Sequence, residues 1–185
     1  MIRRGHDENR RRTVLQTLTI RSAVEGDAAA LLAIYRPFVE STAVSFEAVV
    51  PTVEEFAARI VKALAGWHWL VAEQDGQCIG YAYGSSHRER HAYRWSVEVS
   101  VYVHPDYRRQ GAGRALYLRL FEELARKGFC NAYAGTTLPN EGSVALHRGV
   151  GFEFIGVFKA VGRKFGTWHD VAWFQRVLRD SPPSG

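Results

Sequence analysis

Hydrophobic residues recur along the chain with two alternating periods, one typical of strands and one typical of helices. The first strand is predicted at LTIRSA, residues 18–23, and two helices follow it. Asp27 is placed to cap the first helix, which Pro37 is expected to end or kink. Thr52 and Glu55 have the spacing of a capping box at the start of the second helix.

Three successive strands are predicted next, at residues 67–74, 77–86 and 94–104. An Asp75-Gly76 pair supplies the tight turn between the first two, and the polar loop HRERHAY joins the second to the third. Short connections of this kind join neighbouring antiparallel strands, so we expect these three strands to pair in order.

The rest of the chain predicts a helix over 111–127, a strand over 129–136, a short helix capped by Asn140, and strands over 152–162 and 171–178. The order of elements is thus β, α, α, three β, α, β, α, two β. This order predicts an α/β layered fold around a mixed, mostly antiparallel sheet flanked by helices.

A length of 185 residues favours one domain, which we place at residues 18–180. An apolar content of 46% is ample for one core. Residues 1–17 carry five arginines against two acidic residues, and we expect a basic, disordered leader without the apolar stretch of a secretory signal. Residues 181–185, SPPSG, are expected to form a disordered tail.

Composition also excludes several partners. No apolar run approaches 18 residues, so no membrane association is expected. The net charge of +5 lies largely in the leader, so nucleic-acid binding is not expected. Cys78 and Cys130 show no metal-site spacing, and two cysteines are too few for a disulfide scaffold, which fits a cytoplasmic location.

The stretch VHPDYRRQGAGRA, residues 103–115, places arginines and glycines where a strand gives way to a helix. Free amides at a helix N-terminus and arginine side chains favour a phosphate or pyrophosphate. A Walker loop is excluded because no Gly-x4-Gly-Lys-Ser/Thr run occurs, and Leu116 occupies the third glycine position of a dinucleotide fingerprint. A tight turn with solvated arginines is the alternative interpretation of this loop alone.

Two motifs, in this order, resemble the GCN5-related N-acetyltransferase (GNAT) superfamily. The first is Arg108-x-x-Gly111-x-Gly113 after VYV, and the second is Asn140 followed by SVALH and GVGF. More narrowly, segments from Leu18 to Leu178 resemble the phosphinothricin/methionine sulfoximine N-acetyltransferase branch, among them AVSFEAVVPTVEEFAARI, WLVAEQDGQCIGYAYGS, RERHAYRWSVEVSVYV, LPNEGSVALHRGVGF and VGRKFGTWHDVAWFQ.

The resemblance implies an enzyme that moves acetyl from acetyl-CoA to the α-amino group of a small amino-acid analogue. Phosphinothricin, methionine sulfoximine and methionine sulfone are the implied acceptors, and transfer is direct, in a ternary complex and without a metal. The resemblance also implies a homodimer, for which the aromatic-rich C-terminal strands are the candidate interface.

By the same resemblance, the loop clamps the coenzyme A pyrophosphate, and the short helix after Asn140 packs beside the pantetheine arm. Strand backbone groups pair with the pantetheine amides in the manner of an added strand. The residues thus assigned to acetyl-CoA are Val101, Tyr102, Val103, Arg108, Arg109, Gln110, Gly111, Ala112, Gly113, Arg114, Asn140 and Ser143.

Glu98 and His147 are the candidate catalytic residues. Strand alternation in RWSVEVSVYV puts Glu98 on one face with serines and its valine neighbours on the other. A carboxylate there needs a partner or a cleft, and partial burial is expected to turn it into a useful base, acting through a water. His147, seven residues after Asn140, stands where the wider superfamily often has a tyrosine near the thiolate. Which of the two is the base stays open. Two structural alternatives also stay open: Glu98 as an exposed strand glutamate and His147 as a core histidine.

The acceptor is expected to meet the loop before the Glu98 strand. The guanidinium group of arginine can donate two parallel hydrogen bonds to the oxygens of a carboxylate or a phosphinate. The residues assigned to the acceptor are Phe46, Arg88, Arg90, Tyr93, Glu98 and Ser100. His87 and His91 have the spacing of a helical zinc pair, but residue 88 is Arg where that motif needs Glu, so no zinc is expected.

Two alternatives remain. The same chemistry could serve another amine, such as a different amino acid, a polyamine or a protein N-terminus. The chain could also be a non-catalytic acyl-CoA-binding module, against which the presence of Glu98, His147 and the full loop argues.

Overall fold

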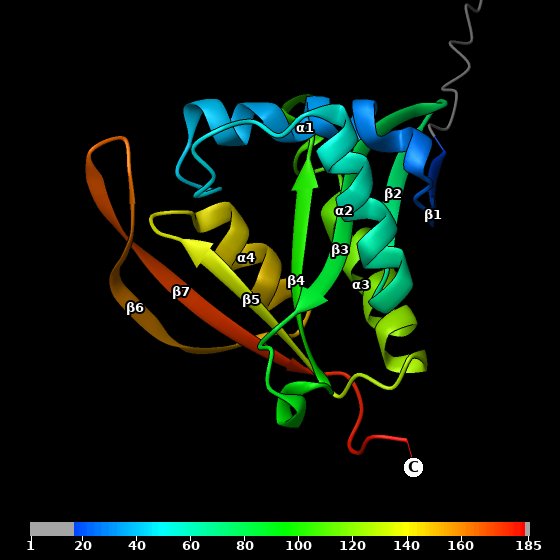
Figure 1. The fold of residues 1–185 in the computed structure, drawn as a ribbon, viewed down its shortest axis with the longest axis vertical. Coiled ribbons are helices and arrows are strands. Elements are labelled where there is room, and N and C mark those ends of the chain that lie inside the picture. The colour runs from blue at the N-terminus through cyan, green and yellow to red at the C-terminus, as the bar shows by residue number, and fades with distance from the viewer. Residues whose placement is uncertain (1–16, 184–185) are drawn as a thin grey trace, which may run out of the picture.

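The computed structural model describes residues 17–183 and is built around one seven-stranded sheet (Figure 1). The predicted leader, apart from Thr17, and the last two residues of the predicted tail lie outside this range. Along the chain the elements are β1 Leu18–Ser22, η1 Glu25–Asp27, α1 Ala28–Ser41, α2 Val53–Gly66, β2 Trp69–Gln74, β3 Gln77–Ser86, η2 His91–Tyr93, β4 Ser96–Val103, η3 Pro105–Tyr107, α3 Ala112–Arg126, β5 Asn131–Thr137, α4 Glu141–Gly149, β6 Glu153–Lys164 and β7 Thr167–Val177. This order confirms the predicted succession of strands and helices.

The strands lie in the order β1-β2-β3-β4-β5-β7-β6. All neighbours are antiparallel except β4 and β5, which run parallel. The predicted fold class, a mixed and mostly antiparallel sheet with flanking helices, is therefore confirmed.

Helices cover both faces of the sheet (Figure 1). On one face α3 and α4 bury a mixed core in which Leu116, Leu120 and Leu124 pack with the inward valines of β4 and with aromatic rings. On the other face α1 and α2 pack over aromatic side chains of the strands, with Phe56 edge-on against Trp69 and Tyr81. Each face of the sheet therefore has its own core, and the side under α1 and α2 is called the aromatic face below.

The local signal at Thr52 and Glu55 acts as predicted, whereas those at Pro37 and Asp27 do not act fully as predicted. Thr52 and Glu55 form the predicted capping box at α2, each side chain accepting the other residue's backbone N–H at 3.1 and 2.8 Å. Pro37 does not end α1, which continues to Ser41. Proline has no N–H to donate to the Ala33 carbonyl, so the helix lacks one of its i→i−4 hydrogen bonds there. Asp27 precedes α1 as predicted, but its carboxylate makes no cap bond to that helix.

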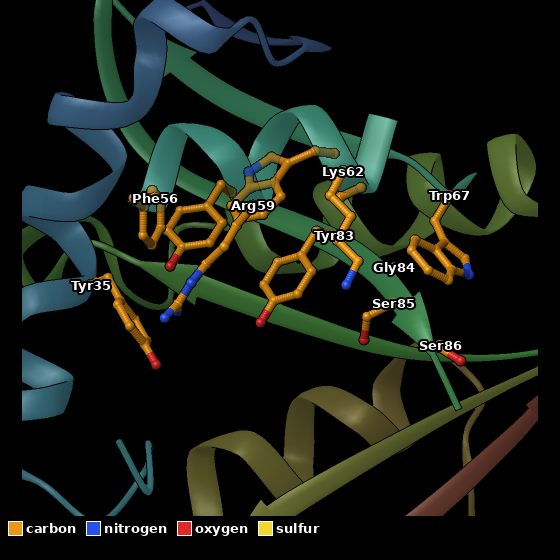
Figure 2. Close-up of a pocket in the computed structure, with 12 residues that line it drawn as sticks. Tyr35, Phe56, Arg59, Lys62, Trp67, Tyr83, Gly84, Ser85 and Ser86 are labelled. Carbon is orange, nitrogen blue, oxygen red and sulfur yellow. The ribbon is translucent and has the colours of Figure 1, made fainter. Parts of the chain in front are cut away.

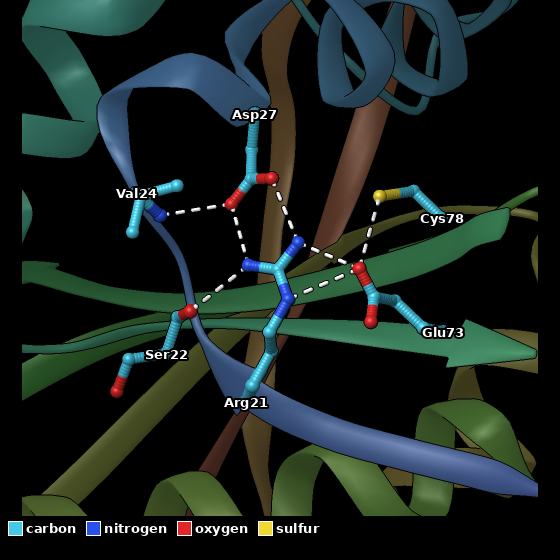
Figure 3. Close-up of polar contacts among 6 residues, drawn as sticks. All are labelled: Arg21, Ser22, Val24, Asp27, Glu73 and Cys78. Atoms are coloured by element: carbon cyan, nitrogen blue, oxygen red, sulfur yellow. Dashed lines mark hydrogen bonds and ion pairs between the residues drawn. The ribbon is translucent and has the colours of Figure 1, made fainter. Parts of the chain in front are cut away.

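Asp27 instead joins the edge of the sheet to the start of α1 (Figure 3). Its two carboxylate oxygens accept from the Arg21 guanidinium at 2.7 and 2.8 Å, and one of them also accepts the Val24 N–H. The same guanidinium donates to Glu73 of β2 at 2.6 and 3.0 Å. The Arg21 guanidinium, together with the Val24 amide, lowers the pKa of Asp27 below its ordinary value of 3.8.

No helix within residues 17–183 is both long enough and apolar enough to cross a membrane.

Replacing Asp27 with Asn should lower the free energy of unfolding at pH 7 by about 2 kcal/mol, because a charged hydrogen-bonded partner of Arg21 is lost. The folded-state pKa of Asp27 is depressed, so its contribution is present above its ordinary value of 3.8 and is lost as pH falls below that value. Urea denaturation of both proteins between pH 7 and pH 3 checks this: the difference should shrink toward acid.

Glu40→Gln is the matched control, because it removes the exposed Arg36–Glu40 pair on α1 and should change stability by less than about 0.5 kcal/mol. An Asp27→Asn variant that unfolds at the wild-type urea concentration at pH 7 would contradict the structural role of this cluster.

Candidate active site

The centre of the sheet opens where β4 and β5 part. The two strands pair for only three residues, with Glu98 opposite Tyr133 as the last pair. Beyond Glu98 no strand of residues 17–183 pairs with this edge of β4, and a cavity of about 60 Å³ lies in the opening. Its lining comes from four elements and the α1–α2 loop: Val44, Val99, Ser100, Val101, Tyr102, Tyr117, Gly135, Thr136, Thr137, Asn140, Ser143 and His147.

This opening brings together several residues that the sequence assigns to one site. Val101, Tyr102, Asn140 and Ser143, all predicted to meet the cofactor, line it together with His147. Tyr102 points away from the valines, as strand alternation predicts, and its ring packs edge-on against Tyr35 and Phe38 of α1. The ring of Tyr102 is thus part of the aromatic core, so its backbone is the part nearer the edge of β4.

The arginine- and glycine-rich loop ends at the N-terminus of α3. Arg109 and Gly111 both have left-handed backbone angles, φ +59° and +91°, and Gly111 occupies the N-cap position. Because glycine has no side chain, α3 receives no side-chain cap, and its first-turn amides can bind an anion. Arg108 is held over the Phe38 ring at 5.3 Å, whereas Arg114 is exposed on the first turn of α3.

Gly113 has a packing role in this loop. A Cβ built on Gly113 would lie 3.3 Å from a Leu146 methyl group and 3.6 Å from a Val103 methyl group. Its lack of a side chain therefore lets α3 approach α4 and β4. Gly111, by contrast, is required for its backbone angle.

Helix α4 carries Asn140, Ser143 and His147 into the opening. The Asn140 side chain accepts the Ser143 N–H at 3.1 Å, as the predicted cap requires. The His147 side chain is buried, with 3% of its surface exposed, and its ring stacks on Phe174 at 5.1 Å. Burial lowers the pKa of His147 to about 4, so the imidazole is neutral at neutral pH.

The hydrogen bonds of His147 define its tautomer. Nδ1 lies 2.7 Å from the Ser143 carbonyl oxygen, which can only accept, so Nδ1 carries the proton. Nε2 is then an acceptor and lies 3.2 Å from the Tyr117 hydroxyl. Tyr117 also lines the opening, and burial raises its pKa above the ordinary range. Both ring nitrogens of His147 are thus engaged within the protein, and the Tyr117 oxygen is the polar atom of this pair that can accept a further hydrogen bond.

Glu98 lies on the other face of the sheet in a polar cluster. Val97 and Val99 are buried in the core under α3, while 30% of the Glu98 side chain is exposed, which agrees with the predicted alternation. One carboxylate oxygen, Oε1, lies 3.0 Å from His87 Nδ1 and 3.2 Å from Arg88 Nη1. The carboxylate therefore has charged and polar partners and keeps Oε2 for another group.

The other predicted acceptor residues are not all gathered around Glu98. Tyr93 contacts the His87 ring at 5.9 Å, and Arg90 lies exposed at the start of η2. Phe46 lies against Gly162 of β6 and faces His169 of β7 at 6.1 Å, so it belongs to the contact between the α1–α2 loop and the β6–β7 hairpin. That contact is held by buried Lys164, whose ammonium donates to the Val39 and Ser45 carbonyls at 2.6 and 2.7 Å.

A second and larger hollow adjoins Glu98 on the aromatic face (Figure 2). It measures about 290 Å³ and lies between α2 and β3. In the β3–β4 ladder, Ser85 stands directly opposite Glu98 and Tyr83 opposite Ser100, so these four side chains share a face. Burial raises the pKa of Tyr83, which lies beside the Ser100 hydroxyl.

Sequence reasoning missed His87, Tyr117 and Tyr83. Tyr117 looks like an ordinary core position of an amphipathic helix, and Tyr83 like an ordinary strand aromatic, so neither gives a signal. His87 does stand in a polar loop, but its contact with Glu98 depends on the pairing of β3 with β4.

Comparison with known proteins agrees with this geometry. Residues 20–173 match the model of a family described as acetyltransferase (GNAT) domain. A phosphinothricin N-acetyltransferase of Alcaligenes faecalis is 42% identical over 162 residues, 86% of this chain and 82% of that protein. An L-methionine sulfoximine/L-methionine sulfone acetyltransferase of Salmonella typhimurium is 37% identical over 162 residues, 87% of this chain and 95% of that protein.

The fold is also similar to solved structures. A GNAT superfamily phosphinothricin acetyltransferase from Sinorhizobium meliloti, solved in complex with AcCoA, superposes with a TM-score of 0.86 at 38% identity, covering 91% of this chain and 95% of that one.

Proposed function

The chain belongs to the GNAT acetyltransferase family, and we propose that it transfers acetyl from acetyl-CoA to the α-amino group of a small amino-acid analogue such as phosphinothricin, methionine sulfoximine or methionine sulfone. The observation that carries this proposal is the position of Glu98: a half-buried carboxylate with one free oxygen at the point where β4 and β5 part. The acceptor amine on one face of the sheet and the thioester of acetyl-CoA entering from the other face would meet there.

Acetyl-CoA fits the residues around the opening and supplies the activated acetyl group. The uncapped N-terminus of α3, with Gly111 in its left-handed conformation, suits the pyrophosphate, and Arg108, Arg109 and Arg114 supply positive charge. Gln110, Ala112 and Gly113 contribute backbone to the same turn. The unpaired edge of β4 from Val101 to Val103 suits the pantetheine amides, and Asn140 and Ser143 lie beside that path.

Two proton movements accompany the transfer. The acceptor nitrogen bonds to the acetyl carbon while the carbon–sulfur bond breaks, the acceptor ammonium loses a proton, and the thiolate gains one. We propose that Glu98 removes the proton of the acceptor ammonium, directly or through a water, because Glu98 is accessible from the acceptor face. In the structure the Tyr117 hydroxyl donates to neutral His147. We assign the proton that the thiolate gains to this hydroxyl, which would turn from His147 to the sulfur as the carbon–sulfur bond breaks.

Most of the residues that we propose to bind the acceptor lie in or beside the loop between β3 and β4. Arg88 and Arg90 are proposed to bind oxyanions of the acceptor, with Tyr93 and Ser100 beside them. Phe46 would contribute to the acceptor site through the α1–α2 loop. Other amines keep the same chemistry and remain the alternative acceptors. We place the enzyme in the cytoplasm, because both of its cysteines are free thiols, as a reducing compartment favours.

Glu98→Gln should lower kcat by about a hundredfold or more, because the acceptor ammonium loses its base, while KM for acetyl-CoA changes little. The acidic limb of the wild-type pH–rate profile should also flatten in the variant. Thiol release from acetyl-CoA with methionine sulfoximine, methionine sulfone and phosphinothricin as acceptors measures both.

An unchanged pH profile in Glu98→Gln would remove Glu98 from the role of base. Absence of turnover with every amine, despite tight binding of acetyl-CoA, would favour the non-catalytic alternative. Glu122→Gln, on the exposed side of α3, is the control substitution and should leave the rate unchanged.

The β6–β7 hairpin is the surface through which we propose that two copies of the chain associate. Large apolar side chains there are half or more exposed: Phe154, Ile155, Phe158, Val161, Phe165 and Trp168. A cluster of this kind on an edge hairpin is typical of an interface.

Sedimentation should therefore find twice the chain mass of 20.8 kDa, and the double substitution Ile155→Glu and Phe158→Glu should shift the protein toward one chain. Val24→Glu changes an equally exposed valine at the opposite end of the sheet and should leave the mass unchanged. A wild-type protein that sediments as a single chain at micromolar concentration would refute the dimer.

A further inference from the structure

The hollow between α2 and β3 has features that the transfer step alone leaves unexplained. Its walls are mostly aromatic, from Tyr35, Phe56, Trp67, Trp69, Tyr81 and Tyr83. At about 290 Å³ it is near the lower end of small-molecule sites, large enough for one amino-acid side chain. Ser85 and Ser86 form the end of the hollow nearest Glu98, because Ser85 is the cross-strand partner of Glu98.

Two cationic side chains of α2 reach this hollow, and they differ in their partners. The Arg59 guanidinium is neutralised by Glu47, to which it donates at 2.6 and 3.2 Å. Lys62 makes no hydrogen bond or ion pair with any residue from 17 to 183. Figure 2 shows its ammonium directed into the hollow, toward Tyr83 and Ser85.

A polar atom in the wall also lacks a partner. Trp69 has 2% of its surface exposed, and its Nε1–H has no hydrogen-bond acceptor among the described residues. This nitrogen is itself shielded by the rings around it, so a molecule in the hollow does not reach it as the side chains stand. The hollow therefore offers aromatic walls and one unpaired positive charge.

We propose that this hollow receives the side chain of the acceptor and that Lys62 pairs with an anionic group at its tip. The inference rests on the proposed function and deepens it: the α-amino group lies at Glu98, the α-carboxylate at Arg88 and Arg90, and the side-chain tip at Lys62. Aromatic faces suit the methylene and methyl groups of the acceptor, and a tip oxygen can accept from the Lys62 ammonium. Lys62 then selects a phosphinate over a neutral group of the same shape.

Phosphinothricin and methionine sulfone test this directly, because they share a carbon skeleton, a terminal methyl group and a tetrahedral tip, and differ in the charge of that tip. Lys62→Met should lower kcat/KM for phosphinothricin about tenfold to a hundredfold, since a charge-assisted contact is lost. It should leave kcat/KM for methionine sulfone and KM for acetyl-CoA unchanged. Lys62→Arg should restore most of the phosphinothricin activity.

Lys127→Met is the matched control, because it removes a lysine of the same charge outside the hollow. Equal losses with both acceptors in Lys62→Met, or no loss with either, would overturn the role of Lys62. A wild-type enzyme that acetylates neither acceptor would instead refute the proposed function, and the inference with it.

A second inference comes from a different observation, the fixed position of His87. Its ring stacks on Tyr133 at 4.4 Å and 14°, and 13% of its side chain is exposed. Nδ1 lies 3.0 Å from Glu98 Oε1, and a carboxylate oxygen can only accept, so Nδ1–H donates. Tyr133 is also the residue directly opposite Glu98 in the β4–β5 ladder.

We infer that His87 is a positioning residue, which holds Glu98 by Oε1 and directs Oε2 to the acceptor nitrogen. The other polar groups around the carboxylate are Arg88, Tyr83 and Tyr133. Arg88 is half exposed and is free to turn to the acceptor, whereas His87 is clamped by its rings. His87 therefore supplies the permanent hydrogen bond.

Two substitutions separate the hydrogen bond of His87 from its ring. His87→Phe keeps a ring on Tyr133 but removes the donor. It should lower kcat about tenfold and move the acidic limb of the kcat/KM profile to higher pH, because a carboxylate without that donor binds its proton more tightly. His87→Asn keeps an amide donor near the Nδ1 position and should behave close to wild type.

The reverse ranking, with His87→Asn impaired and His87→Phe normal, would show that only the ring packing matters. Unchanged pH profiles in both variants would also overturn the inference. If Glu98→Gln remained fully active, the failure would lie in the proposed base and not in the geometry of His87.

Discussion

The site depends on the short pairing of β4 with β5, which ends at Glu98 and Tyr133. Strand β5 pairs on its other edge with β7 along its whole length, from Asn131 to Thr137. Strand β4 is paired in the same way with β3, from Val97 to Val103. Each strand is thus held in the sheet by its outer neighbour, while the facing edges of the two strands are not paired with each other past Glu98. Backbone groups on those edges need other hydrogen-bond partners, which an extended ligand can supply.

Burial gives the two faces of this opening different acid–base character. His147 is enclosed by aromatic rings on the side covered by α3 and α4, and desolvation keeps it neutral with a pKa of about 4. Glu98 lies on the other face among His87, Arg88 and serine hydroxyls, where a negative charge has partners. A neutral imidazole with a bound tyrosine hydroxyl and a solvated carboxylate therefore lie on opposite sides of one strand. The alternation of β4 directs Glu98 to one face, while α3 and α4 hold Tyr117 and His147 on the other.

Sequence reasoning predicted the element order, the fold class and the two capping motifs, because these depend on local periodicity and on spacing within a few residues. It also placed Asn140, Ser143, His147 and Glu98 on the elements that carry them. Asp27 occupies the N-cap position of α1 as predicted, but the Arg21 guanidinium binds its carboxylate and no cap bond forms. The helix continues past Pro37 instead of ending there. His87, Tyr117 and the hollow beneath α2 could not be predicted, since each arises from pairing or packing between segments far apart in the sequence.

The buried ammonium of Lys164 has a consequence for how distant parts of the molecule communicate. Through the Val39 and Ser45 carbonyls it fastens the turn of the β6–β7 hairpin to the end of α1 and the loop above the opening. Phe46, one residue beyond Ser45, is pressed against the same hairpin. If the acceptor binds against this loop, as proposed, a contact that changes the hairpin position can change the acceptor affinity, and the bound acceptor would then change the strength of that contact by the same factor.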